Sequence, residues 1–365
     1  MRSLTLHIAR IEMTSELLVG QGLIPQIATI FKTATRSSIA IVADRGAEVF
    51  ARRIQEDLAL PSASLLIVAG GEQVKTVQAL ESTWQFFADQ RLDRRSLVIT
   101  LGGGATSDLV GFAAATYMRG IQFAHVPTTL LAQVDASIGG KTGINFNGVK
   151  NLLGAVSQPS HVVIDIDVLA TLPDRERRSG FAEIVKHGLI ADREYFTTVT
   201  SKPYSAWSSN ELIEIIYRSC QIKQAIVESD ETEQGPRKML NFGHTVGHAL
   251  EEYALQERIP FTHGEAVSIG MVAEAHIAHL IGKLSSEEYS ASCAGIAAAG
   301  LPIILPVPFD HARILALMAR DKKNVGGQIR WSLLDAIGSA VFDLSAPSEV
   351  VAQALSSITP RSSQG

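Results

Sequence analysis

The chain has 365 residues, of which 46% are hydrophobic and 19% are charged, a composition typical of a globular protein with a large buried fraction. Its length exceeds what one hydrophobic core usually organises, so we expect two domains. The formal net charge of −5 argues against nucleic acid and against an anionic membrane as a partner. An anionic small molecule would therefore have to be bound by a local group of basic residues.

The cysteine content and the N-terminal segment predict the compartment. Cys220 and Cys293 both lie in helix-like segments, so we expect two buried thiols, no disulfide and a reducing compartment. Residues 1–12 mix charged with apolar side chains, unlike a secretory signal, so we expect a cytoplasmic protein. The most apolar later stretch, residues 293–309, contains three prolines and is predicted to connect helices rather than to span a membrane.

Short apolar runs alternate with helical patterns through the first half of the chain. The runs predict strands at residues 38–43, 64–69, 97–101, 123–126 and 162–166. Helices are predicted at residues 47–60 and 75–91. This alternation indicates βαβ units in a mostly parallel sheet, which bind ligands at the carboxyl ends of their strands.

The pattern changes near residue 169 to long helical periodicities with few strand signals. Helices are predicted at residues 173–190 and 210–230, and Lys223 lies within the apolar face of the second. We therefore place a domain boundary near Ala170. The predicted fold class is an α/β domain with a mostly parallel sheet over residues 1–170, followed by a mainly α-helical domain over residues 171–365. The polar last residues, 356–365, are expected to be disordered.

Three consecutive glycines, Gly102 to Gly104, follow the predicted strand 97–101. A helix is expected from about Thr106, capped by Thr106 or Ser107, and its first N–H groups could bind a phosphate. The turn is not G-x-G-x-x-G, because Ser107 stands at the third glycine position, and simple chain reversal is an equal alternative. The case for a dinucleotide improves because Asp44, residues 70–75 and Thr128-Thr129 fall at the same predicted edge.

Three segments of the second half carry residues that bind metals. They contain Glu183, then His244 and His248, then His263. The four-residue spacing puts His244 and His248 on one helix face and so pairs them as ligands, although the glutamate of H-E-x-x-H is missing and a zinc protease is excluded. One glutamate and two histidines would suit a catalytic zinc site with an open position. Taken singly, each histidine is explained as well by a core or surface role.

Lysines and arginines recur beside these segments. They are Lys141, Lys150, Lys186, Lys223, Arg237, Lys322 and Lys323. Most lysines of an acidic protein are solvated surface charges. If these converge, however, the substrate carries several negative charges, such as a phosphate and a carboxylate.

Together these segments closely resemble the 3-dehydroquinate synthases, a family of sugar phosphate cyclases. The matching motifs run in family order between about residues 70 and 338 and include G-G-G-A-T-S-D, P-T-T-L-L-A-Q-V-D-A-S-I-G-G-K-T-G-I-N, A-E-I-V-K-H-G, L-N-F-G-H-T-V-G-H-A and H-G-E-A-V-S-I-G-M. The departures are few: Gly70 replaces a common aspartate, Ser107 a frequent glycine, and Pro236 precedes Arg237. None removes a group that the chemistry requires.

The resemblance implies a Rossmann-like domain that binds NAD, a helical domain that holds one divalent metal, Zn or Co, and a homodimer. By position, the metal ligands would be Glu183, His244 and His263, with His248 beside the substrate instead of on the metal. NAD would contact Asp44, Glu72, Lys75, Gly103, Gly104, Ala105, Thr106, Ser107, Asp108, Thr128, Thr129, Lys141, Lys150, Leu169, Ala170, Thr171 and Leu172. The substrate would contact Arg119, Asp135, Lys141, Lys150, Asn151, Lys186, Lys223, Arg237, Asn241, His248 and either Lys322 or Lys323.

The implied reaction converts 3-deoxy-D-arabino-heptulosonate 7-phosphate, a phosphorylated keto-sugar acid, to 3-dehydroquinate and phosphate in the shikimate pathway. Oxidation by NAD, phosphate elimination, re-reduction and an intramolecular aldol closure follow one another, and NAD emerges unchanged. Three alternatives stay open: another sugar phosphate cyclase such as an aminodehydroquinate synthase, a metal-dependent oxidoreductase like glycerol dehydrogenase, and a non-catalytic NAD-binding relative. Retention of Lys150, Lys223, Arg237 and Asn241 favours a carboxylated substrate.

Overall fold

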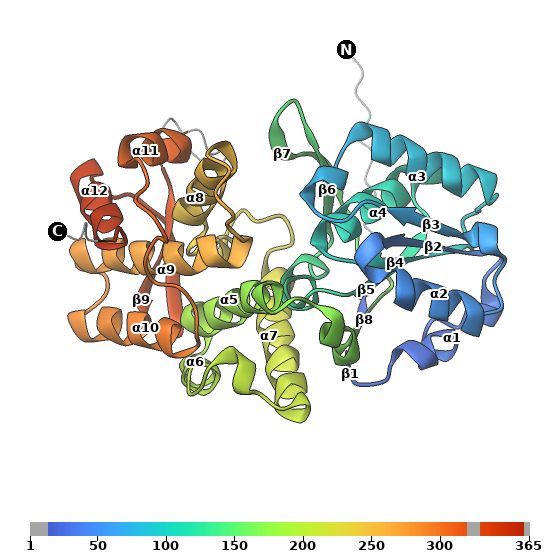
Figure 1. Cartoon of the computed structure of the whole chain (residues 1–365), viewed down its shortest axis with the longest axis horizontal. Helices are drawn as coiled ribbons and strands as arrows, with labels where there is room; N and C mark the ends of the chain where they lie inside the picture. Colours follow the sequence, from blue (N-terminus) through green and yellow to red (C-terminus); the bar gives the residue numbers. More distant parts are fainter. Residues whose placement is uncertain (1–13, 320–328, 361–365) are drawn as a thin grey trace, which may run out of the picture.

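The computed structural model describes residues 14–319 and 329–360, in which a sheet-containing half and a helical half lie side by side (Figure 1). The first half is built on a six-stranded parallel sheet of order β1-β8-β5-β4-β2-β3. Its strands are β1 (Glu16–Gly20), β2 (Ile39–Asp44), β3 (Leu65–Val68), β4 (Leu97–Gly102), β5 (Gln122–Pro127) and β8 (His161–Asp165). The five strands predicted from sequence and the parallel sheet are thereby confirmed.

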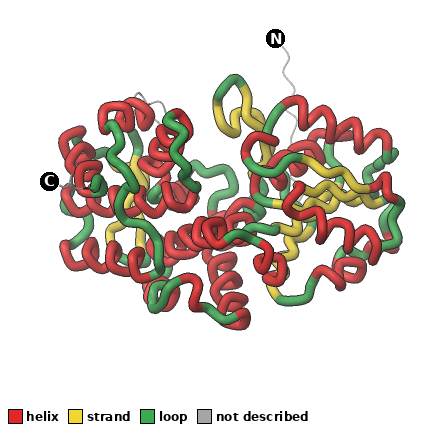
Figure 2. Tube along the Cα trace, in the orientation of Figure 1, coloured by secondary structure: helices red, strands yellow, loops and turns green. Residues whose placement is uncertain are grey.

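Helices cover both faces of this sheet, as Figure 2 shows. They are α1 (Ile27–Ile30), α2 (Glu48–Asp57), α3 (Val77–Asp89) and α4 (Gly104–Thr116). Strand β4 lies in the middle of the sheet, and its side chains alternate between two cores. Ile99 and Leu101 face one cluster, whereas Val98 packs with Leu109 and Phe123 on the other face. Burial on both faces explains why the sequence of β4 is apolar except for Thr100 and the terminal Gly102.

The second half is mainly helical and carries one small hairpin. Its helices are α5 (Asp174–Ala191), α6 (Arg193–Val199), α7 (Ser209–Ser229), α8 (His244–Gln256), α9 (His263–Leu280), α10 (Ser286–Ala298), α11 (His311–Ala319) and α12 (Ser348–Ser357). The hairpin consists of β9 (Trp331–Ala336) and β10 (Ser339–Leu344). Helices α5 and α7 match the predicted ranges 173–190 and 210–230 to within one residue. Both lie between the two halves in Figure 1.

A second hairpin leaves the sheet-containing half and was not predicted. It consists of β6 (Lys141–Phe146) and β7 (Val149–Val156), in a stretch for which the sequence predicted no strand. Two glycines allow its strands to approach closely, since a Cβ on Gly143 would lie 2.6 Å from Leu153 O and one on Gly154 would lie 2.2 Å from Thr142 O. The β9–β10 hairpin was missed in the same way.

Several local predictions need correction. Helix α4 begins at Gly104 rather than Thr106, and no side chain caps it. Residues 293–298 belong to helix α10 and not to a connection. Cys220 is buried, but Cys293 is only half-buried, and both thiols are free. Residues 356 and 357 end helix α12, while residues 361–365 lie outside the described part of the chain. Among helices of the described ranges, none combines the length and the apolarity needed to cross a bilayer.

Candidate active site

The triple-glycine turn lies at the carboxyl edge of the sheet and is tied to Asp44 at the end of β2. Asp44 Oδ2 accepts hydrogen bonds from Gly103 N (3.0 Å) and Thr106 Oγ1 (3.2 Å). A Cβ on Gly102 would lie 2.3 Å from the same carboxylate oxygen, and φ is +154° there, so only glycine fits. The turn therefore presents the start of a 13-residue helix at this edge, a geometry suited to an anion.

The other predicted nucleotide contacts gather around that edge. Thr128 N donates to Gly102 O (2.9 Å), and Thr129 contacts Gly103. Lys75 is buried and pairs with Asp108 at 2.7 Å, with Glu72 at 3.7 Å and with Asn151. The remaining members of this set lie in two segments. One is the first turn of α4, which contains Gly104, Ala105, Thr106 and Ser107. The other is the 3-10 helix that follows β8, together with the residue after it, and contains Leu169, Ala170, Thr171 and Leu172.

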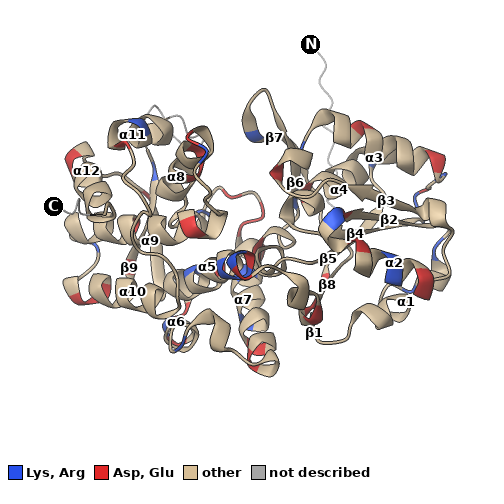
Figure 3. Ribbon diagram, in the orientation of Figure 1, with Lys and Arg blue, Asp and Glu red and all other residues tan. Residues whose placement is uncertain are grey.

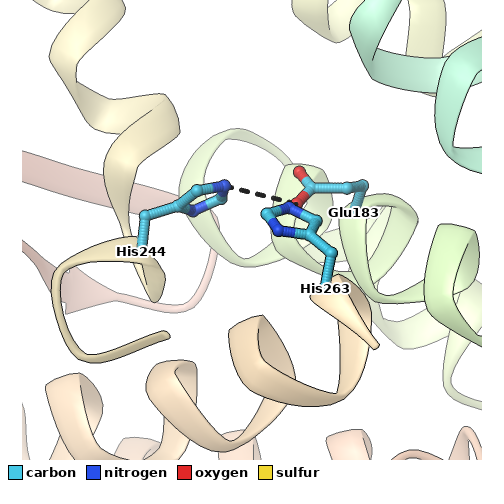
Figure 4. Close-up of side chains that lie close together, drawn as sticks. All are labelled: Glu183, His244 and His263. Atoms are coloured by element: carbon cyan, nitrogen blue, oxygen red, sulfur yellow. Dashed lines mark ion pairs between the residues drawn. The ribbon is translucent and has the colours of Figure 1, made fainter. Parts of the chain in front are cut away.

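Glu183, His244 and His263 converge from three helices, α5, α8 and α9, as Figure 4 shows. One ligand atom of each lies within 4.8 Å of the others. Glu183 Oε1 is 3.5 Å from His244 Nε2 and 3.6 Å from His263 Nε2. His244 Nδ1 lies 3.1 Å from Phe242 O, and because a carbonyl can only accept, Nδ1 donates this hydrogen bond while Nε2 faces Glu183.

This donor set fits a divalent metal ion. Glu183 is fully buried; its Oε2 forms an ion pair with Lys186 Nζ, and its Oε1 faces the Nε2 atoms of both histidines. Burial opposes its ionisation, but Lys186 and the two histidines hold the pKa of Glu183 well below its usual value. Burial also disfavours a charged imidazole at His263, yet hydrogen bonds to Glu183 and Glu251 raise the pKa of His263 to about 10. One carboxylate and two imidazoles with an open side are the ligands of a catalytic zinc site.

The histidine spacing alone suggested a different pair. His248 lies on the same helix as His244, and the centroids of the two rings are 5.1 Å apart. It does not belong to the group formed by Glu183, His244 and His263, whose ligand atoms lie within 4.8 Å of one another. The pairing of His244 with His248 is therefore wrong as a ligand set in this geometry, because His263 from α9 faces Glu183 in its place. Glu183 also forms a group with Asp135 and His187, although lysines pair with both carboxylates there.

The predicted substrate cations are also gathered here, each already paired with an acidic or carbonyl group. Lys223 is buried and donates to Asp135 Oδ1 at 2.6 Å. Lys141 pairs with Glu233, whose other oxygen accepts from Asn241 Nδ2 at 2.6 Å. Lys150 pairs with Glu251 at 2.8 Å, Arg237 donates to Gly139 O and Glu231 O, and the buried Lys186 pairs with Glu183. Figure 3 also shows basic and acidic residues side by side on α5, between the halves.

Two predicted contacts are not brought into this group. Arg119 is exposed beyond the C-terminal end of α4, about 20 Å along the helix from the glycine turn. Lys322 and Lys323 lie outside the described residues. Conversely, sequence reasoning missed Glu233 and Glu251, which pair with predicted site residues, and Glu274, which lies beside one. Glu274 accepts hydrogen bonds from Gly243 N and Val246 N, around the backbone of His244. No motif singled them out, since each acts through a contact distant in sequence.

Comparison with known proteins identifies the family to which the chain belongs. Residues 65–179 match the family model of the 3-dehydroquinate synthase N-terminal region, and residues 180–324 match that of its C-terminal region. The chain belongs to the 3-dehydroquinate synthase family. One member, from Thermosynechococcus vestitus, is 45% identical over 79% of each chain. Another, from Hydrogenovibrio crunogenus, is 38% identical over 97% of this chain and 99% of its own.

A solved structure of a related cyclase shares the fold. The 2-epi-5-epi-valiolone synthase ValA from Streptomyces hygroscopicus subsp. jinggangensis, with NAD+ and Zn2+ bound, superposes with a TM-score of 0.85 and 27% identity, over 97% of this chain and 99% of its own. Membership of the synthase family confirms the resemblance stated from the sequence. It also favours cyclase chemistry over that of a glycerol-dehydrogenase-like oxidoreductase.

Proposed function

We propose that this chain is a 3-dehydroquinate synthase that converts 3-deoxy-D-arabino-heptulosonate 7-phosphate to 3-dehydroquinate and phosphate. The observation that carries the proposal is the convergence of Glu183, His244 and His263 beside paired cations in a member of this family. The substrate is a phosphorylated acid, and an acidic protein needs a local basic site to bind it. Lys141, Lys150 and Lys223 are available for that task.

The cofactors are NAD and one divalent metal ion, Zn or Co. In support, the carboxyl edge offers the α4 N-terminus for a pyrophosphate, and ValA binds NAD+ and Zn2+. When bound, NAD supplies a hydride acceptor and donor and the metal supplies Lewis acidity. Glu183, His244 and His263 would hold the metal, while Lys75 and the residues of the glycine turn would hold the nucleotide.

Within this reaction the chain's own residues bind and orient. Lys141 and Lys150 come from the β6–β7 hairpin, and Lys223 and Arg237 from the helical half, so an anion between them would be held from both sides. The elimination step needs a negatively charged leaving phosphate, whose charge lysines stabilise. His248, whose ring centroid is 5.1 Å from that of His244, would contact the substrate.

We further propose a cytoplasmic homodimer with two domains, over residues 1–170 and 171–365. The sheet ends at Asp165 and the first long helix begins at Asp174, which supports that division. The β6–β7 hairpin exposes Phe146, Val149, Leu152, Leu153 and Val156, and an apolar surface of this kind favours association. Since Arg119 lies about 20 Å along α4 from the glycine turn of its own chain, we propose that a substrate contact by Arg119 would be made in the second subunit. Two free thiols fit the cytoplasm.

One assay tests the reaction. The protein is given the heptulosonate phosphate with catalytic NAD and Zn2+, and phosphate release and NADH are followed together. We expect one phosphate per substrate consumed and no net NADH. Stoichiometric NADH would contradict the proposal and indicate a dehydrogenase. The amino analogue of the substrate, run in parallel, separates dehydroquinate from aminodehydroquinate synthesis by the ratio of their kcat/KM values.

A further inference from the structure

Glu251, on helix α8, contacts one residue of the metal group and one of the opposite half of the molecule. Its Oε2 is 3.3 Å from His263 Nδ1, and its Oε1 accepts from Lys150 Nζ at 2.8 Å. We propose that Glu251 is a positioning residue that orients His263 for the metal and couples metal affinity to the state of Lys150. The inference rests on the proposed metal site but assigns a role that the proposed reaction does not require.

The geometry of the His263 ring carries the first part of this proposal. Its Nε2 faces Glu183 Oε1 at 3.6 Å, while its Nδ1 faces Glu251 Oε2 at 3.3 Å. With a metal at Nε2, Nδ1 keeps its hydrogen and donates it to a carboxylate. Such a partner fixes the tautomer and the plane of the ring and makes Nε2 a better ligand. The Nδ1 atom of His244 has a neutral partner, the carbonyl oxygen of Phe242. Of the two histidines, only His263 therefore has a charged partner at Nδ1, the carboxylate of Glu251.

The proposed coupling to Lys150 follows because the two carboxylate oxygens of Glu251 bind different residues, Oε1 binding Lys150 and Oε2 binding His263. Lys150 is half-exposed on β7, at 48% of its side-chain surface, and Figure 1 shows its hairpin reaching from the sheet-containing half toward α8. While Lys150 holds Oε1, its positive charge reduces the negative charge available to His263. An anion that takes Lys150 away returns that charge to His263 and strengthens the ligand. By linkage, metal and anion then increase each other's affinity.

The neighbouring residue provides a matched control. Glu252 is exposed, and its carboxylate accepts only from Gln256 Nε2 (3.2 Å), one turn along α8, among the interactions recorded for it in the described residues. Glu252→Gln therefore removes the same charge from the same helix without touching His263 or Lys150. Glu251→Gln keeps the size of the side chain and an oxygen acceptor but removes the carboxylate charge.

The first experiment measures metal affinity directly. Metal-free protein is titrated with Zn2+ against a chelator, and with Co2+ while its visible absorption band is recorded. We expect Glu251→Gln to weaken binding about 10- to 100-fold, in the range found for outer-shell partners, and to shift the Co2+ band. Glu252→Gln should stay within about twofold of the unmodified protein, as surface changes do. Equal affinity in Glu251→Gln and the unmodified protein would overturn the inference.

A double-mutant cycle tests the coupling. Lys150→Met should tighten Zn2+ binding several-fold when Glu251 is present and leave it unchanged in the Glu251→Gln background. The same change in both backgrounds would contradict the coupling, because Lys150 would then act by simple charge repulsion. Thermal unfolding without metal shows that each variant folds. If the unmodified protein itself binds no metal, the proposed function fails; if it binds and the two variants do not differ, only this inference fails.

Discussion

Gly264, the residue after His263, allows the start of α9 to touch α5 and so brings His263 to Glu183. A Cβ at position 264 would lie 2.0 Å from Ser179 O and 2.4 Å from Ser179 Cα. Both are backbone atoms, so no side-chain rotation can relieve the overlap. Ordinary contact begins at 3.4 Å, and Gly264→Ala must therefore move α9 away from α5 by about 1.4 Å, or strain both helices at a cost of roughly 1–3 kcal/mol.

A displacement of that size exceeds what a metal site tolerates, since ligand distances hold to about 0.2 Å. We expect Gly264→Ala to weaken Zn2+ binding and to lower kcat about 100-fold. The assays are chelator competition for the metal and phosphate release for turnover, with thermal unfolding of the metal-free protein as a check on the fold. Gly20→Ala is the control, because its nearest neighbour is the Leu23 side chain at 3.5 Å. Unchanged metal affinity in a folded Gly264→Ala protein would refute the argument.

Other changes test the buried charges separately. Glu183→Gln should abolish metal binding and turnover while the fold persists; full activity would refute its assignment as a ligand. Lys223→Met leaves the carboxylate of Asp135 without its lysine partner. We expect the free energy of unfolding, measured in urea, to fall by about 2 kcal/mol, which is less than the loss for a fully buried ion pair. The double variant that also carries Asp135→Asn should recover this free energy. Burial lowers the pKa of His125 to about 3. Between pH 6.5 and 3, His125 therefore binds a proton in the unfolded chain but not in the folded chain. As the pH falls through this range, the free energy of unfolding decreases by about 1.4 kcal/mol per pH unit. His125→Leu should flatten this acid slope between pH 6.5 and 3, and an unchanged slope would exclude His125 as its source.

The inner strands of the sheet were predictable because they are buried on both faces, whereas the half-buried edge strand β1 was missed. Strands buried on both faces read as continuous apolar runs, and β4 and β8 each contain one. The two hairpins were not predictable in the same way. In β6 and β7 the strand pattern is interrupted by Gly143 and Gly154, whose role is close approach between backbones. In sequence they look like the glycines of a binding loop.

The candidate metal group shows where sequence reasoning stops. Spacing along one helix found His244 and paired it with His248, because two residues four apart share a helix face. The group in the structure needs His263, which arrives on α9 through the contact of Gly264 with Ser179. The sequence had already marked His263 as a candidate, but only the family resemblance chose it over His248 as a ligand. Glu251 was invisible for the same reason, since its partners are 12 and 101 residues away.

The carboxylates that pair with the site lysines also limit which anions can bind to those lysines. Lys141, Lys150 and Lys223 each contact an acidic side chain of the protein. An anion that binds to these lysines must therefore displace the carboxylates with which they are paired. A halide ion carries too little charge to displace several carboxylates at once, whereas a compound with two anionic groups at the right separation can. We therefore expect the resting protein to bind halide ions weakly, since its own carboxylates occupy the lysines.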